Sequence, residues 1–405
     1  MTSVLLREQL ASAELRGEPN GHAIQATPFA WRDRRSIPQR PWVYGRWLLR
    51  GTVTAVVAPG GVGKSSLVAS MVLSLTTDRP VLGVQVWGGA KRTWYWNLED
   101  DRDELERQLQ AAALLHQIGP DDCGDRLFLD SGLEGAELCI AEDGPAGCRI
   151  RTPVVEALAD ELSARKIDVL IVDPFVSSHS VGENDNGAVD AVVKQWARLA
   201  KRSNCSIVLV HHTRKLHGQK VTAEAARGAV ALTAAARVTL VLNRMDEQQG
   251  VSLGIDDEEE RRRLFTVQDD KHNRAPAEKA RWYRLASVEL GNGEGLGDNV
   301  GVVTLWTPPD TFEGVRLDHL IRVQQRMGQG SYRESYQSPE WLGHLVGDVL
   351  GIDPQTKSSK ARLRRIISEW IENDVLRVTE GKDERRKPVK FVVVGRSALD
   401  SAPPD

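Results

Sequence analysis

The sequence predicts an α/β protein with a mainly parallel central sheet, followed by a small C-terminal α+β domain. Between about residues 41 and 310, short apolar runs alternate with helical stretches, as in successive βαβ units. A Gly-rich loop at residues 58–65 joins an apolar strand to a helix. From about residue 311 onward, helical segments precede a basic hairpin, which is the element order of a winged helix.

The elements follow from the hydrophobic pattern along the chain. Strands are expected at Thr52–Ala58, Thr93–Asn97, Arg126–Asp130, Val169–Asp173, Ile207–His211 and Val238–Asn243, and helices at Lys64–Leu75, Arg102–His116, Thr152–Ala164 and Ala188–Lys201. Further strands are expected at Phe265–Val267, Arg281–Ala286 and Val300–Leu305. Leu133–Ile150 is rich in glycine and acidic residues, and we expect it to lie beside the sheet.

Three parts are predicted along the chain. Residues 1–40 are polar and weakly periodic, and we expect a partly ordered arm. Residues 41–310 form the sheet-containing core, and residues 311–405 form the winged-helix-like domain. In this last part the expected helices are Leu317–Met327, Pro339–Leu350 and Ser358–Asn373, and the expected strands are Val375–Val378 and Val389–Val394.

Composition excludes some classes of protein. Hydrophobic residues make up 41% of the 405 residues and charged residues 27%, as in globular proteins. The formal net charge of -3 means that nucleic acid could bind only at a local basic patch. The four cysteines lack metal-ligand spacing, and no apolar run approaches the roughly 20 residues of a membrane helix. The N-terminus also lacks the apolar stretch of a signal peptide, so we expect a cytoplasmic protein without membrane contact.

The strongest local signal is the loop Ala58–Ser65, which has the sequence of a phosphate-binding P-loop. Its glycines allow backbone N–H groups to point at the β-phosphate of ATP, beside the positive end of the following helix. Lys64 would reach the β- and γ-phosphates, and the Ser65 hydroxyl would hold Mg²⁺. The predicted nucleotide-binding residues are Ala58, Pro59, Gly60, Gly61, Val62, Gly63, Lys64, Ser65 and Ser66.

Two carboxylates complete the predicted ATP site. Asp173 ends an apolar strand in the manner of a Walker B motif, where it would orient the water shell of Mg²⁺. Ser65 and Asp173 are therefore the predicted metal residues. Glu99 follows the strand after the P-loop helix, a place from which it could activate the attacking water as general base. The alternative is that Glu99 caps the next helix.

The adjacent residues His211 and His212 end another apolar strand. A polar group at this position can sense the γ-phosphate and transmit its presence to the loop that follows. We therefore expect at least one of these histidines to act in the ATP site, and simple packing is the alternative.

The order of these motifs resembles that of the plasmid RepA-type hexameric replicative helicases, within the wider RecA/DnaB-like ATPase group. The resemblance covers about residues 41–290, from the P-loop through Asn97–Asp100, Asp173, His211-His212 and Lys271-His272-Asn273. It implies a RecA-like core that hydrolyses Mg-ATP, with Glu99 catalytic and the His pair at the phosphates.

The resemblance also implies a homohexameric ring with ATP at each subunit interface and single-stranded DNA through the centre. Arg237, at the end of Ala234–Arg237, occupies the family's place for an arginine finger, although alanines replace the polar residues expected before it. A surface charge at a strand start is the alternative. The loops that would grip DNA are Ser177–Asp190, which is acidic, and Lys215–Thr222, in which Lys215, His217 and Lys220 could bind phosphates.

The C-terminal domain departs from the family, which consists essentially of the ATPase core. Residues 357–390 carry eleven basic and six acidic residues, so this segment is basic in an otherwise acidic chain. We expect it to contact duplex or forked DNA through the helix Ser358–Asn373 and a wing at Gly381–Pro388. Binding of a protein partner and a purely structural role are the alternatives.

Two classes of function remain open at this point. One is an ATP-driven replicative DNA helicase of a plasmid, phage or integrated element. The other is a RecA-like ATPase that regulates or loads other proteins on DNA without separating strands. Both share the ATP site, and no sequence motif encodes strand separation, so the helicase function rests on the family resemblance.

Overall fold

The computed structural model describes residues 26–135, 137–145, 147–213, 222, 230–272, 280–295, 297–382 and 386–398. The chain divides into two compact units, Met1–Arg40 and Pro41–Asp405. In the first unit, the described residues contain a single 3-10 turn, η1 (Arg34–Ser36), and the Asp33 side chain accepts from its Arg35 N–H at 2.8 Å.

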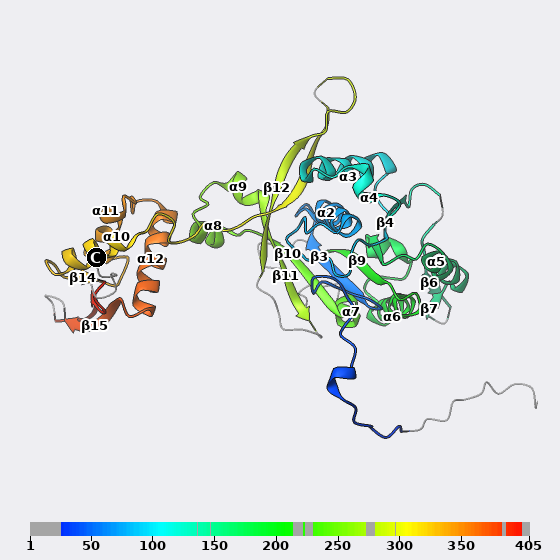
Figure 1. Cartoon of the computed structure of the whole chain (residues 1–405), viewed down its shortest axis with the longest axis horizontal. Helices are drawn as coiled ribbons and strands as arrows, with labels where there is room; N and C mark the ends of the chain where they lie inside the picture. The colour runs from blue at the N-terminus through cyan, green and yellow to red at the C-terminus, as the bar shows by residue number, and fades with distance from the viewer. Residues whose placement is uncertain are drawn as a thin grey trace, which may run out of the picture. The chain divides into compact units, whose positions relative to one another are not determined.

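A nine-stranded sheet dominates the described part of the second unit (Figure 1). The strands lie in the order β13-β12-β11-β10-β3-β9-β8-β4-β5. Their bounds are β3 (Val53–Pro59), β4 (Thr93–Asn97), β5 (Leu127–Ser131), β8 (Val169–Asp173), β9 (Ser206–Thr213), β10 (Val238–Arg244), β11 (Leu264–His272), β12 (Arg281–Glu289) and β13 (Asn299–Leu305). Strands β10 through β5 pair in parallel, and β11, β12 and β13 extend the sheet antiparallel beyond β10.

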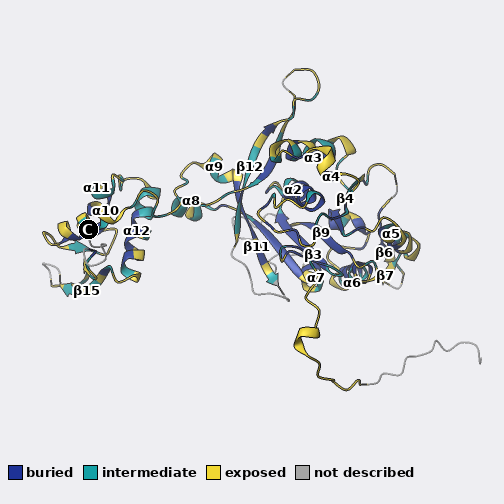
Figure 2. Cartoon of the chain, viewed as in Figure 1, coloured by how far each residue is buried: buried dark blue, intermediate teal, exposed yellow. Residues whose placement is uncertain are grey.

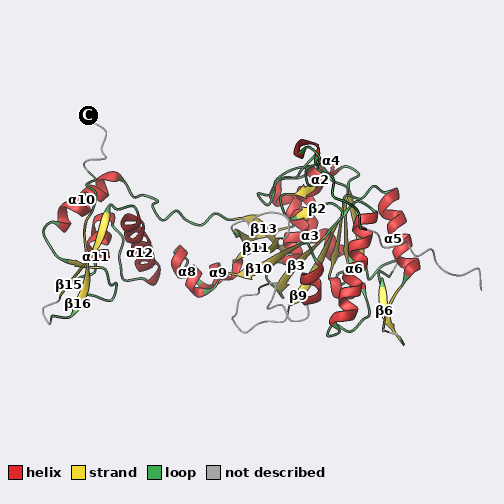
Figure 3. Cartoon of the chain, turned by 90° about the horizontal axis from the view of Figure 1, so that it is seen from below, coloured by secondary structure: helices red, strands yellow, loops and turns green. Residues whose placement is uncertain are grey.

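Helices cover both faces of this sheet, as expected for buried parallel strands (Figures 2 and 3). One face packs on α2 (Lys64–Thr77) and α3 (Arg102–His116), and the other on α5 (Thr152–Ala164), α6 (Asn186–Arg202) and α7 (Val230–Ala235). Strand β3 shows the alternation clearly, because Ala55 and Val57 enter the second core while Val56 and Ala58 enter the first.

Smaller elements surround the sheet. They are β1 (Trp42–Tyr44) paired with β2 (Leu48–Leu49), α4 (Pro120–Cys123), the hairpin β6 (Ala141–Gly144) and β7 (Gly147–Ile150), η2 (Phe175–Ser178), α8 (Glu247–Leu253) and α9 (Glu258–Arg263). The hairpin accounts for part of the glycine- and acid-rich segment 133–150, and it forms a separate two-stranded sheet.

The C-terminal residues form a small α+β arrangement with its own hydrophobic core. Its elements are α10 (Leu317–Met327), β14 (Tyr332–Arg333), α11 (Leu342–Leu350), α12 (Lys357–Glu372), β15 (Leu376–Lys382) and β16 (Pro388–Val394). The strands pair in the order β14-β16-β15. Leu363, Ile366 and Trp370 of α12 point into this core, which is the packing expected for the apolar face of that helix.

None of the helices in the described part of the chain is long and apolar enough to cross a membrane.

Candidate nucleotide-binding site

The P-loop connects the carboxyl end of β3 to the first turn of α2, as the sequence predicts. Gly61 (φ +73°) and Gly63 (φ +111°) both adopt left-handed backbone conformations that favour glycine. Between them, the Val62 side chain is buried in the first core and anchors the loop to the sheet. The loop therefore has the backbone curvature and the adjoining helix N-terminus that a phosphate site requires.

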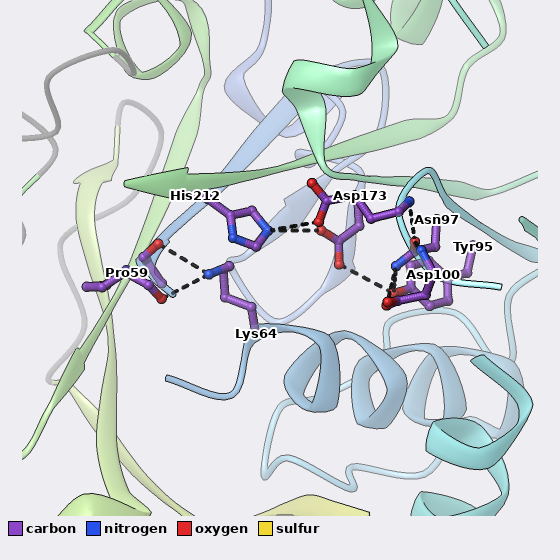
Figure 4. Close-up of polar contacts among 9 residues, drawn as sticks. Pro59, Lys64, Tyr95, Asn97, Asp100, Asp173 and His212 are labelled. Carbon is purple, nitrogen blue, oxygen red and sulfur yellow. Dashed lines mark hydrogen bonds and ion pairs between the residues drawn. The ribbon is translucent and has the colours of Figure 1, made fainter. Parts of the chain in front are cut away.

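Lys64 lies under this loop, with its side chain almost completely buried. Its Nζ donates to the carbonyl oxygens of Pro59 at 2.9 Å and Ala58 at 3.3 Å (Figure 4). Burial lowers the pKa of Lys64 to about 8, and the nearby carboxylates of Asp173 and Glu99 partly oppose that shift. A bound triphosphate would supply further negative charge and favour the protonated amine.

The carboxyl ends of β9, β8 and β4 bring three predicted residues together beside the P-loop. The His212 Nε2 atom lies 3.9 Å from Asp173 Oδ1 and 4.0 Å from Glu99 Oε2 (Figure 4). Asp173 is buried at the end of β8, whereas Glu99 and His212 are open to solvent. This arrangement places one buried carboxylate and one exposed carboxylate near the same nitrogen of the His212 ring.

A hydrogen-bond network that the sequence analysis missed holds these two carboxylates in place. The Asn97 Oδ1 atom accepts from the backbone N–H groups of Glu99 at 2.8 Å and Asp100 at 2.7 Å. Its Nδ2 donates to the Tyr95 hydroxyl at 3.1 Å, which in turn donates to Asp173 Oδ2 at 3.3 Å. An asparagine at the end of a buried strand is a typical start of such a turn, and that signal could have identified Asn97.

A cavity of about 550 Å³ opens in front of the P-loop. Its lining joins P-loop residues and His212 to side chains of α3 and to the end of the β12–β13 hairpin: Gly61, Gly63, Lys64, Ser65, Ser66, Glu104, Arg107, Gln108, His212, Leu285, Asp298, Asn299, Val300 and Gly301. Arg107 is paired there with Glu104 at 3.3 Å and with Asp298 at 3.1 Å. No sequence motif indicates this wall of the cavity.

The residues fit the groups that were predicted to bind. Ser65 lines the cavity and Asp173 is a buried carboxylate, so both provide the oxygen ligands that Mg²⁺ prefers beside nucleotide phosphates. Ser66 instead donates its hydroxyl to the carbonyl of Gly301 at 2.6 Å. Among the described residues, no group of three or more His, Cys, Asp and Glu side chains forms a metal site built from protein alone.

The structure separates the two adjacent histidines. His212 pairs with Ala58 across the β3–β9 register and lies on the P-loop side, whereas His211 pairs with Val57 and lies on the opposite face. There the His211 ring contacts the ring of Phe175, with 6.4 Å between the centroids. Burial lowers the pKa of His211 to about 4, so its ring is neutral at neutral pH. Of the pair, only His212 lines the cavity.

Arg237 lies at the opposite end of the parallel strands, where β3 begins. Its backbone N–H donates to the carbonyl of Val53 at 3.0 Å, where β3 begins, and its side chain is exposed. Strand β3 is seven residues long, so Arg237 is roughly 20 Å from the P-loop that follows this strand. The Arg237 side chain therefore cannot reach the nucleotide of its own subunit.

Several predicted residues lie outside the described part of the chain. They are Lys215, His217 and Lys220 of the loop Lys215–Thr222, and Asn273. Segment 177–190 is described and contains the end of η2 and the start of α6.

Comparison with known proteins gives a matching family. Residues 18–218 match the model of a family described as AAA domain. Among solved structures, the chain is similar to the crystal structure of the RadB recombinase, with 15% sequence identity and a TM-score of 0.37, over 58% of this chain and 88% of that chain. The P-loop, the sheet order and the family match together identify a P-loop ATPase domain of the RecA-like type, and such domains bind ATP and usually Mg²⁺.

Proposed function

We propose that this chain is the subunit of an ATP-driven DNA motor, a RepA-like hexameric replicative helicase of a plasmid, phage or integrated element. The observation that carries the proposal is the position of Arg237, which lies where β3 begins, opposite the P-loop at the carboxyl end of this strand. A positive side chain at that end of the strands is useful to ATP hydrolysis only if it faces the nucleotide of a neighbouring subunit. Subunits arranged head to tail in this way form a ring when the rotation between neighbours closes.

The surroundings of Arg237 support the same proposal. A cavity of about 500 Å³ beside it is lined by basic side chains of α6, namely Lys194, Arg198 and Lys201. Lys194 is paired with Asp190 at 2.6 Å. The positive charge of this surface is complementary to a neighbour's triphosphate and to the carboxylates around it.

Strand separation is the direct test of the motor. In a fork substrate with a labelled strand, the protein should release that strand when ATP and Mg²⁺ are present. Lys64→Ala should not release it, because this variant lacks the positive side chain that would contact the β- and γ-phosphates. If DNA stimulates ATP hydrolysis but no strand is released, the second candidate applies. The protein would then be a RecA-like ATPase that regulates or loads other proteins on DNA.

The C-terminal residues are proposed to contact the DNA backbone, and α12 offers two suitable side chains. Arg364 is exposed and lies 4.1 Å over the ring of Tyr336, and Lys360 is partly exposed on the same helix. Arg362, in contrast, is occupied, since its guanidinium donates to the carbonyls of Thr311 and Glu313. The wing at residues 381–388 is described except for residues 383–385.

The double variant Lys360→Gln/Arg364→Gln should bind DNA about tenfold more weakly at low salt, since each side chain removes one phosphate contact. The slope of log K against log salt should become shallower by roughly two. The control variant Arg322→Gln/Arg326→Gln removes two exposed positive charges from α10 and should bind DNA like the unchanged protein. Equal losses in the two variants would mean a general charge effect, and no loss would favour a protein partner for this domain.

A further inference from the structure

Strand β10 ends beside the P-loop, at Arg244. It pairs in parallel with β3 on the side opposite β9, with Val238 facing Thr54 and Val241 facing Val57. The carboxyl ends of parallel strands meet at one edge of the sheet, so the P-loop lies between His212 on β9 and Arg244 on β10. The same strand therefore begins next to Arg237 and ends at the ATP site of its own subunit.

The guanidinium of Arg244 contacts the P-loop from the end of β10. Its Nη2 atom donates to the carbonyl oxygen of Gly61. The contact is close, because a Cβ atom added to Gly61 would lie 3.3 Å from the same Nη2 atom. Arg244 itself is exposed, so the contact is made at the surface of the site and not in the core.

This hydrogen bond fixes the orientation of one peptide group in the loop. In a planar trans peptide, the Gly61 carbonyl and the Val62 N–H point in opposite directions. A carbonyl held toward Arg244 therefore turns the Val62 N–H away from it, toward the concave side of the loop where a β-phosphate would lie. Gly61 and Val62 have no polar side chains of their own that could hold this peptide.

Lys64 and Arg244 both donate to carbonyl groups of the P-loop, but they differ in whether this contact can persist when a nucleotide binds. Lys64 donates to the loop carbonyls of Ala58 and Pro59, but it is the side chain that would turn to the phosphates when a nucleotide binds. Arg244 does not line the nucleotide cavity, so its guanidinium can keep the Gly61 carbonyl with a nucleotide present. A planar guanidinium with several donors also holds a carbonyl better than a single flexible amine.

We propose that Arg244 is a positioning residue of the ATP site, which holds the Gly61–Val62 peptide in the orientation that binds the β-phosphate. The proposal depends on the P-loop alone and not on the DNA activity. Because ADP and ATP share the β-phosphate, loss of Arg244 should weaken the binding of both nucleotides to a similar extent. A side chain that touched the γ-phosphate would instead favour ATP alone.

The test is the affinity of the full chain for fluorescent ADP and for a fluorescent non-hydrolysable ATP analogue. Arg244→Met keeps the length of the side chain and removes the donors, and it should bind both ligands roughly five- to tenfold more weakly, because a hydrogen bond from a charged group is lost. In steady-state hydrolysis, KM should rise by a similar factor and kcat should change little. Arg244→Lys should recover part of the lost affinity.

Arg165→Gln serves as the matched control, since it removes an exposed arginine that is paired with Glu161 on α5, far along the chain from the loop. It should bind both nucleotides normally. A loss confined to the ATP analogue would overturn the proposal in favour of a γ-phosphate contact. Unchanged affinity in Arg244→Met would also overturn it. So would an equal loss of affinity in Arg244→Met and Arg244→Lys if both variants also melt at a lower temperature, since the loss would then come from reduced stability of the fold.

Discussion

Glu99→Gln should still bind ATP, while its turnover should fall by about a hundredfold or more, since the variant keeps the shape of the side chain and removes the base. Glu99 is suited to this role by its place, because it is an exposed carboxylate beside the buried Asp173 and 4.0 Å from His212 Nε2. Nucleotide affinity and single-turnover hydrolysis, measured separately, distinguish the loss of chemistry from a loss of binding.

Asp100→Asn is the control for this prediction. Asp100 is the neighbouring carboxylate, but it is turned toward Asn97, whose Nδ2 lies 3.4 Å from its Oδ2, and burial raises its pKa. This variant should keep most of the turnover. If Glu99→Gln loses nucleotide affinity along with turnover, Glu99 has a structural role and the general base must be sought elsewhere.

The parallel half of the fold could be predicted because each strand carries its own signal. Strands β4 and β8 coincide with the expected Thr93–Asn97 and Val169–Asp173, since both are continuous apolar runs that end at a polar residue. Helix α3 begins after Asp101, whose side chain accepts from the N–H of Glu104, which is a cap readable from the sequence. These local signals are strong because the strands are buried on both faces.

Other parts depend on contacts that are distant in sequence and could not be predicted in the same way. The lining of the nucleotide cavity by Arg107 and Gly301 arises only because the β12–β13 hairpin packs beside α3. The short strands β1 and β2 have too few residues to show a period. Arg244 was also missed, because a strand ending in arginine carries no motif.

One feature of the site could have been read from the sequence alone. Successive side chains of a strand point to opposite faces of the sheet, so His211 and His212 could not both face the same phosphate. The predicted strand Ile207–His211 ended at His211, with His212 directly after it. The register with β3 then shows that His212 is the residue on the P-loop side.

Arg237→Ala is expected to bind ATP normally. Its rate of ATP hydrolysis should be lower than that of the unchanged protein by roughly a thousandfold or more. The reason is geometric. Arg237 lies at the amino end of β3 and the P-loop at its carboxyl end, so the missing charge is one that a subunit would supply to its neighbour. The measurement is the rate of ATP hydrolysis together with the affinity for ATP, each at protein concentrations that permit assembly.

A mixture of two inactive variants tests whether the contact is between subunits. Arg237→Ala has an intact P-loop without the arginine, and Lys64→Ala has the arginine with an inactive P-loop, so each alone should be nearly inactive. Where a Lys64→Ala subunit presents Arg237 to the P-loop of an Arg237→Ala subunit, one complete site is restored, and co-expressed chains should regain part of the activity. The control is Arg202→Ala in place of Arg237→Ala, which removes an exposed charge of α6 that is paired with Glu156 and should retain much more activity by itself. If the two chains co-purify and no activity returns, Arg237 does not act on a neighbouring subunit; Arg227 and Arg274, which lie outside the described residues, would then be the next candidates. The ring proposed from the position of Arg237 would in that case lose its main support.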